Sequence, residues 1–162
     1  MKGVLADVSV RTAAAVLAAV LFCTPATATH HPDHFELIVP GERIGDALLG
    51  MPRQDVEAIN RKAACQVAAA YDSAGRAVRL ETNTGGACRT QEGIQVGIGF
   101  GSAIQAFGAS HRVVEDARYP HATAFWISYP HFGITFRVLA MSDSSTLIQA
   151  IAVFPVASGQ AP

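Results

Sequence analysis

Two stretches of this sequence repeat one pattern of apolar residues and glycines, and each pattern ends in a short helical segment. In residues 93–108, Ile94, Val96 and Ile98 alternate as in a strand, small residues follow, and Gly108 closes a helix-like segment. Residues 40–60 carry the same pattern, at an offset of 48 in the helical part and 47 in the strand part. The duplication predicts two strand–helix units, residues 38–88 and 93–157, within one domain.

The N-terminus has the features of a secretory signal peptide. Lys2 and Arg11 precede an apolar run at residues 12–22, and these 11 residues are too few to cross about 30 Å of hydrocarbon as a helix. Ala26 and Ala28 are small residues at the positions that signal peptidase requires, so we expect cleavage after Ala28. An uncleaved anchor is the alternative. The sequence predicts a periplasmic or secreted protein, with signal peptide 1–28 and no transmembrane segment after cleavage.

The expected mature chain is short and nearly neutral. Cleavage after Ala28 leaves 134 of the 162 residues and a formal charge of −2, and the sequence contains no basic block. Nucleic-acid-binding proteins need such a block to neutralise phosphates, so this class of function is excluded. A chain of this length forms one domain, which we expect at residues 38–157, between a histidine-rich leader (29–37) and a C-terminal tail (158–162).

The cysteine count predicts a disulfide. Cleavage removes Cys23 and leaves Cys65 and Cys88 as an even pair in an oxidising compartment. The pair lacks the spacing of a redox or zinc motif, so we expect a structural bond that closes a loop of about two dozen residues.

The order of elements predicts an α+β fold. Residues 37–39 read as a short strand, and a helix opens at Met51 and Pro52 and runs toward Lys62. A hairpin follows at residues 66–71 and 76–81, with Val78 and Leu80 on its buried face. Four strand-like runs then form an antiparallel meander at residues 112–119, 122–129, 133–139 and 147–154. We therefore expect two tandem strand–helix units packed on one antiparallel sheet.

Four short motifs resemble a superfamily of small exported bacterial proteins. They are VPGERIG at residues 39–45, LGMPRQDV at 49–56, GIQVG at 93–97 and GITF at 133–136. Together they are similar to the beta-lactamase-inhibitor-protein-like and SmpA/OmlA (BamE-like) proteins, whose units pack helices on an antiparallel sheet. The resemblance implies a non-catalytic role, either gripping another protein or scaffolding the cell envelope. Fold does not determine function, so the resemblance predicts a class and no partner.

The spacing of the glycines at residues 96–101 does not match that of a cofactor-binding loop. This glycine cluster lacks the third glycine and the parallel βαβ context of a dinucleotide site. Ser102 follows the cluster, but its surroundings do not match a nucleophile elbow. We therefore predict no catalytic residue and no cofactor, and we expect the glycines to serve close packing.

Histidines near the expected mature terminus offer an alternative function. Cleavage after Ala28 would leave Thr29, His30 and His31, whose amine, amides and third-position imidazole can hold Cu(II) or Ni(II) in a square plane. His34 could add an axial ligand. The alternative to the binding role is therefore a periplasmic Cu(II)- or Ni(II)-binding protein. The remaining histidines, His111, His121 and His131, are expected in loops or at strand ends.

The aromatic residues concentrate in the second half of the chain. Alternation along residues 122–129 puts Phe125 and Ile127 on one face and Trp126 on the other. If the first face is core, Trp126 is exposed; in the alternative, Trp126 is buried beneath a helix and Phe125 is exposed. An exposed tryptophan on a sheet is typical of an interface anchor. We therefore predict an exported, non-catalytic domain that binds a protein or cell-envelope component. The predicted partner-binding residues are Trp126, Tyr129, Tyr119, His131 and Phe132.

Overall fold

The computed structural model describes residues 35–116, 124–140 and 146–156. This part of the chain is mostly β, with 45% strand and 14% helix. The predicted α+β fold class is therefore wrong, because only two short helices form and they do not alternate with the strands as repeated units. The elements are β1 (Glu36–Val39), β2 (Arg43–Ile44), β3 (Ala47–Leu48), α1 (Arg53–Asn60), β4 (Ala68–Tyr71), β5 (Ala77–Thr82), β6 (Cys88–Thr90), α2 (Gly101–Phe107), β7 (Arg112–Glu115), β8 (Ala124–Tyr129), β9 (Ile134–Ala140) and β10 (Thr146–Val153).

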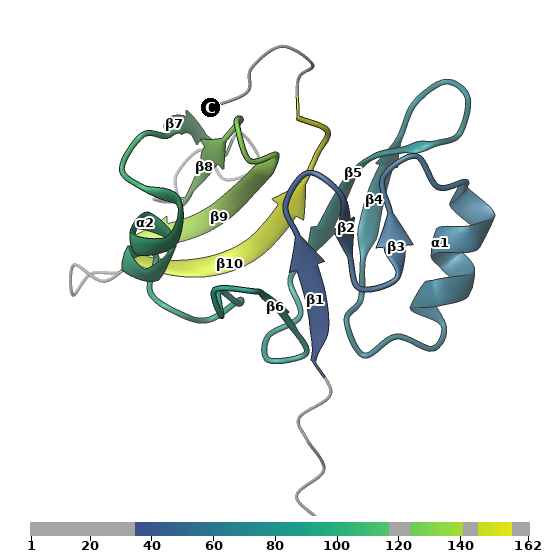
Figure 1. The fold of residues 1–162 in the computed structure, drawn as a ribbon, viewed down its shortest axis with the longest axis horizontal. Helices are drawn as coiled ribbons and strands as arrows, with labels where there is room; N and C mark the ends of the chain where they lie inside the picture. The colour runs from purple at the N-terminus through teal and green to yellow at the C-terminus, as the bar shows by residue number, and fades with distance from the viewer. Residues whose placement is uncertain (1–34, 117–123, 141–145, 157–162) are drawn as a thin grey trace, which may run out of the picture. The chain divides into compact units, whose positions relative to one another are not determined.

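The strands form two sheets rather than the single layer expected. A four-stranded sheet has the order β3-β2-β1-β6, and a six-stranded sheet has the order β4-β5-β10-β9-β8-β7 (Figure 1). The predicted antiparallel meander is confirmed, because β7, β8, β9 and β10 pair in that sequence. The parallel pairing of β1 with β6 was not predicted. In the part of the chain that the structure describes, no helix is long and apolar enough to cross a membrane.

The strand predicted at residues 94–98 does not exist. This segment runs along β10 with only isolated contacts, such as the Gly97 amide donating to the Ile148 carbonyl at 2.8 Å. Gly97 adopts a φ of +94°, which interrupts an extended strand. Ile94 is nevertheless buried, and Val96 and Ile98 pack on the core. The alternating apolar residues therefore belong to a loop that covers the core. Periodicity alone cannot distinguish such a loop from a strand.

The two helices begin 48 positions apart, at Arg53 and Gly101, as the duplication predicts. Their buried faces differ, however. Helix α1 buries Val56, whereas the equivalent residue in α2, Ile104, is 38% exposed and α2 buries Ala103 and Phe107 instead. The repeat in the sequence is therefore not a repeat in packing.

Helix α1 ends at Asn60, two residues before the predicted end. The Asn60 side chain accepts a hydrogen bond from the Val67 amide at 2.9 Å and donates to the Val67 carbonyl at 2.6 Å. These bonds fix the entry to β4 and turn the chain away from the helix axis. Figure 1 shows α1 beside β3 and β4, which it contacts.

The predicted hairpin forms as β4 and β5, with one correction. Ala70 pairs with Arg79 but Tyr71 pairs with Ala77, so Val78 is an extra residue in a β-bulge. The bulge changes the phase of the strand, and Ala77 is buried while Val78 is 40% exposed. Val78 therefore does not share the buried face of Leu80 as the alternation predicted.

The predicted disulfide is confirmed. Cys65 and Cys88 are bonded, with their Cα atoms 5.5 Å apart, and both residues are fully buried. The Glu36 carboxylate accepts hydrogen bonds from the amides of Ala64 (3.0 Å) and Cys65 (3.4 Å). Because Glu36 in β1 also pairs with Cys88 in β6, the disulfide and this carboxylate together hold the α1–β4 connection against the four-stranded sheet.

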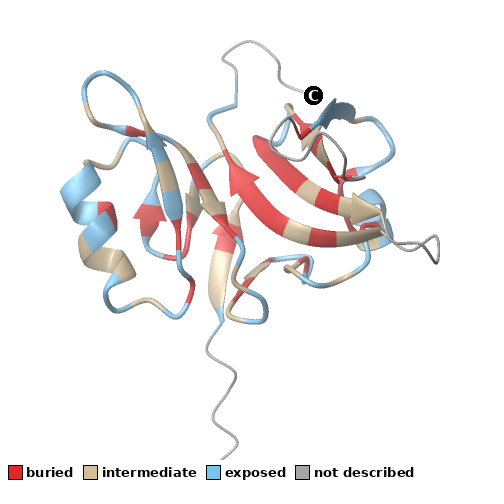
Figure 2. Ribbon diagram, turned by 180° about the vertical axis from the view of Figure 1, so that it is seen from behind, coloured by how far each residue is buried: buried red, intermediate tan, exposed pale blue. Residues whose placement is uncertain are grey.

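One hydrophobic core connects both sheets and α2. Ile38 and Ile44 come from the small sheet, Leu80 and Phe136 from the large one, and Phe107 from α2. Figure 2 shows the buried positions following one another along β9 and β10. Both faces of β10 are buried. One face packs on the core, and the other is part of the sheet face that carries the candidate site.

Candidate partner-binding face

The six-stranded sheet has a second face, directed away from the core. Trp126 pairs with Val114 on β7 and with Arg137 on β9, and Ser128 pairs with Thr135, which in turn pairs with Ala152. Neighbours that pair directly share one face of a sheet. We define the outer face by these side chains and those in register with them on β5 and β10: Arg79, Glu81, Val114, Trp126, Ser128, Thr135, Arg137, Ala150 and Ala152.

The predicted alternation along β8 agrees with this face. Phe125 and Ile127 contact the hydrophobic core, and the half-buried Trp126 lies on the outer face between them. The tryptophan is therefore available at the surface of the sheet rather than being packed beneath α2.

A shallow hollow of about 390 Å³ lies beside Trp126. Its lining combines apolar and aromatic side chains with two hydroxyls and one guanidinium, and Thr135, which is 2% exposed, forms part of its floor. The lining residues are Arg79, Val114, Trp126, Ser128, Thr135 and Phe154.

Arg79 and Trp126 meet above the sheet although their strands are not neighbours. The Arg79 guanidinium carbon lies 4.4 Å from the centroid of the Trp126 ring. Strands β10 and β9 lie between β5 and β8, so the two backbones are three strand spacings apart, or about 14 Å. The contact is possible because the residues between them, Ala152 and Thr135, are small. The two long side chains in turn cover these small residues.

The Arg79 guanidinium also forms an ion pair with a neighbouring carboxylate. Arg79 Nη2 lies 3.3 Å from Glu81 Oε2, and the two side chains are 34% and 23% exposed. The ion pair holds the guanidinium beside Trp126, and at this exposure it contributes little stability by itself. The result is a surface that offers an aromatic ring, a cation and an apolar floor in one place.

Tyr129, predicted as a neighbour of Trp126, is instead a core residue. It is 1% exposed, and its hydroxyl donates to the Gly108 carbonyl at 3.0 Å. Its ring packs 5.5 Å from Phe107 and 6.0 Å from Phe136, centroid to centroid. Burial raises the pKa of the Tyr129 phenol above its ordinary value. Tyr129 therefore connects the end of α2 to the sheet and takes no part in the outer face.

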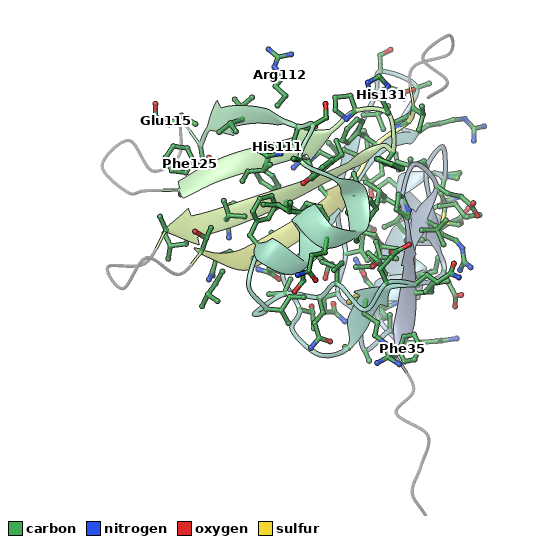
Figure 3. All side chains as sticks on the ribbon, turned by 60° about the vertical axis from the view of Figure 1, so that its left-hand side comes forward. Phe35, His111, Arg112, Glu115, Phe125 and His131 are labelled. Atoms are coloured by element: carbon green, nitrogen blue, oxygen red, sulfur yellow. A yellow bond between two sulfur atoms is a disulfide. The ribbon has the colours of Figure 1, made fainter. Side chains whose placement is uncertain are left out.

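The other predicted partner-binding residues are separated from Trp126. His131 and Phe132 occupy the turn between β8 and β9, where both are exposed. Figure 3 labels His131 at this turn. The Phe132 ring packs against Phe107, with centroids 5.3 Å apart. Tyr119 lies outside the described residues. Of the predicted partner-binding residues in the described part of the chain, Trp126 lies on the outer face, and the residues beside it there were not predicted.

The predicted metal ligands His30, His31 and His34 lie outside the described residues, as does His121. His111 is half-buried between the rings of Phe100 and Tyr129, with centroids at 6.0 and 5.6 Å. Among the residues that the structure describes, no three His, Cys, Asp or Glu side chains gather into a metal-binding group. The N-terminal Cu(II) or Ni(II) site stays a prediction.

Ser102 lies in the first turn of α2, where it borders a hollow of about 360 Å³ with Glu92 and Gln105. The residues lining this hollow include no histidine, and the predicted absence of a catalytic residue stays a prediction.

Sequence reasoning missed Arg79, Val114 and Phe154 as members of the site. The alternation along residues 76–81 indicated that Arg79 faces outward, but it could not show which strand lies opposite. That information depends on the order of strands in the sheet.

Comparisons of the chain with protein-family models, with curated proteins and with solved structures found no match. The resemblance to the beta-lactamase-inhibitor-protein-like and SmpA/OmlA superfamily therefore stays a prediction. The fold and the site define a mostly β domain with two sheets and an outer face on which Trp126 and Arg79 meet.

Proposed function

We propose that this chain is an exported, non-catalytic domain that binds a partner protein of the cell envelope through the outer face around Trp126. The observation that supports the proposal is the contact between Trp126 and Arg79 beside an open hollow. Tryptophan and arginine are, with tyrosine, the side chains enriched among residues that dominate binding energy at protein interfaces. The Cys65–Cys88 disulfide is consistent with an oxidising, extracytoplasmic location.

The surface around the hollow has the character of an interface. Val114 is 45% exposed on one side of Trp126, and the Arg79–Glu81 pair is partly exposed on the other. An apolar centre with a polar rim is the usual composition of a recognition surface. The partner would insert an apolar side chain beside the indole and place polar groups over Arg79 and Glu81.

A comparison of two aromatic truncations tests this proposal. Trp126→Ala removes the proposed anchor, and Phe132→Ala removes an aromatic of 43% exposure from a turn away from the outer face. In pull-downs from envelope extract, we expect Trp126→Ala to lose partners that wild type and Phe132→Ala both retain. Thermal unfolding of each variant separates lost binding from lost folding.

Equal capture by wild type and Trp126→Ala would contradict the proposal. So would equal loss from both variants, because that result would indicate a general effect of aromatic truncation.

A further inference from the structure

The outer face presents more positive than negative charge. Arg79 and Arg137 belong to it, and the exposed Arg112 extends it at the β7 edge, because Arg112 pairs with a residue of that face. Figure 3 shows Arg112 projecting away from the sheet. Among the residues that define the face, Glu81 is the one carboxylate, and it offsets one of these charges. Asp116 continues the same phase beyond β7, but it is 3% exposed, so its charge is not presented to a partner. The face therefore complements an anionic group.

Arg79 has unused hydrogen-bond donors at the hollow. A guanidinium carries several N–H groups, and they lie in its plane. Its contact with the Trp126 ring uses none of these donors, and the Glu81 carboxylate accepts one bond from Nη2 at 3.3 Å. Within the described chain, Glu81 is the hydrogen-bond acceptor that the Arg79 side chain reaches. Arg79 can therefore bind a second carboxylate through parallel hydrogen bonds.

The two hydroxyl groups of the hollow differ in what they can donate. Thr135 Oγ1 donates to the Ile127 carbonyl at 3.1 Å, so its proton is already used. Ser128 pairs with Thr135 across the β8–β9 ladder, and its hydroxyl bonds to no other residue that the structure describes. Ser128 therefore supplies a second donor for an anion in the hollow.

Apolar side chains form the remaining walls of the hollow. Val114 is 45% exposed there, and Trp126 and Phe154 are half-buried. The volume of about 390 Å³ lies near the lower end of the range of about 300–1,000 Å³ found for ligand sites. A hollow of this size suits one apolar side chain with a neighbouring carboxylate.

We infer that the outer face recognises a segment of the partner protein in which an acidic side chain adjoins an apolar one. This inference rests on the proposed function and names the chemistry of the partner. The carboxylate bonds to the Arg79 guanidinium and the Ser128 hydroxyl, and the apolar side chain packs against Trp126, Val114 and Phe154. A second copy of this chain is not the occupant, because two copies of the face would bring their arginines together.

Peptide binding to the isotope-labelled full chain tests the carboxylate, with the indole N–H signal of Trp126, the single tryptophan, as the readout. We expect acetyl-Leu-Asp-Leu-amide to bind at least about tenfold more tightly than acetyl-Leu-Asn-Leu-amide, which replaces the carboxylate by an amide. Acetyl-Gly-Asp-Gly-amide, which lacks the apolar flanks, should also bind at least about tenfold more weakly. Absence of either difference would overturn the inference. Tighter binding of inorganic phosphate than of the Leu-Asp-Leu peptide would also overturn it.

Arg53 provides a matched control, because its guanidinium carbon lies 4.4 Å from the centroid of the Tyr71 ring, as far as Arg79 lies from Trp126. Arg79→Gln should abolish the preference for the aspartate peptide, and Arg53→Gln should retain it. Ser128→Ala, which keeps the Arg79–Trp126 contact, should reduce the preference about threefold even if Arg79→Gln fails to fold. Equal effects of the two glutamine variants, or an unchanged preference in Ser128→Ala, would contradict the assigned donors.

The peptide and pull-down experiments separate this inference from the proposed function. If Trp126→Ala loses partners but wild type binds the aspartate and asparagine peptides equally, the carboxylate is wrong and the proposed function stands. If wild type prefers the aspartate peptide but Trp126→Ala retains every partner, the proposed function is wrong and the anion-binding hollow stands.

Discussion

Arg79 and Trp126 stack at 4.4 Å across two intervening strands, and this contact organises the outer face of the sheet. It depends on Ala152 and Thr135, whose small side chains leave room above β10 and β9. The outer face therefore combines large side chains on β5 and β8 with small side chains on the two strands between them, β10 and β9.

The Arg79–Trp126 contact should contribute measurably to stability. A cation over an indole ring is worth about 0.5–1 kcal/mol at a partly exposed site. We expect a double-mutant cycle of Arg79→Ala and Trp126→Ala, measured by denaturant unfolding, to give a coupling energy of this size. Arg53, which stacks on Tyr71 instead, provides a control pair with Trp126 that should be additive. Additive effects of Arg79→Ala and Trp126→Ala would show that the two residues do not interact.

A larger side chain at Ala152, below the Arg79–Trp126 contact, should separate Arg79 from Trp126. Ala152 is fully buried, so Ala152→Leu overpacks the space below Arg79 and Trp126 and should cost about 1–3 kcal/mol in unfolding free energy. Trp126 is the single tryptophan of the chain, and its fluorescence should shift to the red as it becomes more exposed. Ala106→Leu, at an exposed position of α2, should change neither quantity. An unshifted spectrum in Ala152→Leu would contradict this view of the floor.

Loss of the disulfide should destabilise the fold substantially. The Cys65–Cys88 bond spans 23 positions, and closing a loop of this length contributes about 3 kcal/mol on the chain-entropy model. Thermal unfolding with and without reductant should show a large fall in Tm for wild type. A variant with both cysteines replaced by alanine should start at the lower Tm and be insensitive to reductant. If reductant leaves the Tm of wild type unchanged under conditions that reduce the bond, the disulfide carries no such stabilisation.

The buried phenol of Tyr129 should make stability depend on alkaline pH. Burial raises its pKa in the folded state above the ordinary 10.0, so the folded chain holds this proton more tightly than the unfolded chain. The associated stability is complete below pH 10.0 and is lost as pH rises through the raised folded pKa. The unfolding free energy should therefore decrease more steeply above pH 10.0 in wild type than in Tyr129→Phe.

At neutral pH, Tyr129→Phe should also lose about 1 kcal/mol, because the hydrogen bond to the Gly108 carbonyl is removed. Parallel pH curves for the two proteins would exclude Tyr129 as the titrating group.

Several elements could be predicted from local sequence because local chemistry decides them. Gly108 ends α2 with a φ of +86°, a conformation that glycine adopts at little cost. The turn at Asp72 forms because its carboxylate accepts hydrogen bonds from the amides of Ala74 and Arg76. The β8 alternation placed Trp126 opposite Ile127, and the pairing of cysteines followed from their number.

The predictions that failed depend on contacts between distant segments. Ile94, Val96 and Ile98 have the period of a strand, but they cover the core as a loop, because Gly97 adopts a φ of +94° and the segment makes only isolated contacts with β10. Val78 has the period of a buried residue, but a bulge opposite Tyr71 exposes it.

The sequence by itself determined the turns, the end of α2 at Gly108, the disulfide and the alternation of Trp126 with Phe125 and Ile127, since each depends on residues a few positions apart or on the chemistry of one residue type. Only the tertiary structure decided that β1 pairs with β6, that Tyr129 is buried under α2, and that Arg79 meets Trp126. The physical reason is that strand order is selected by the free energy of the whole core. The local pattern of apolar and polar residues does not show which strands become neighbours.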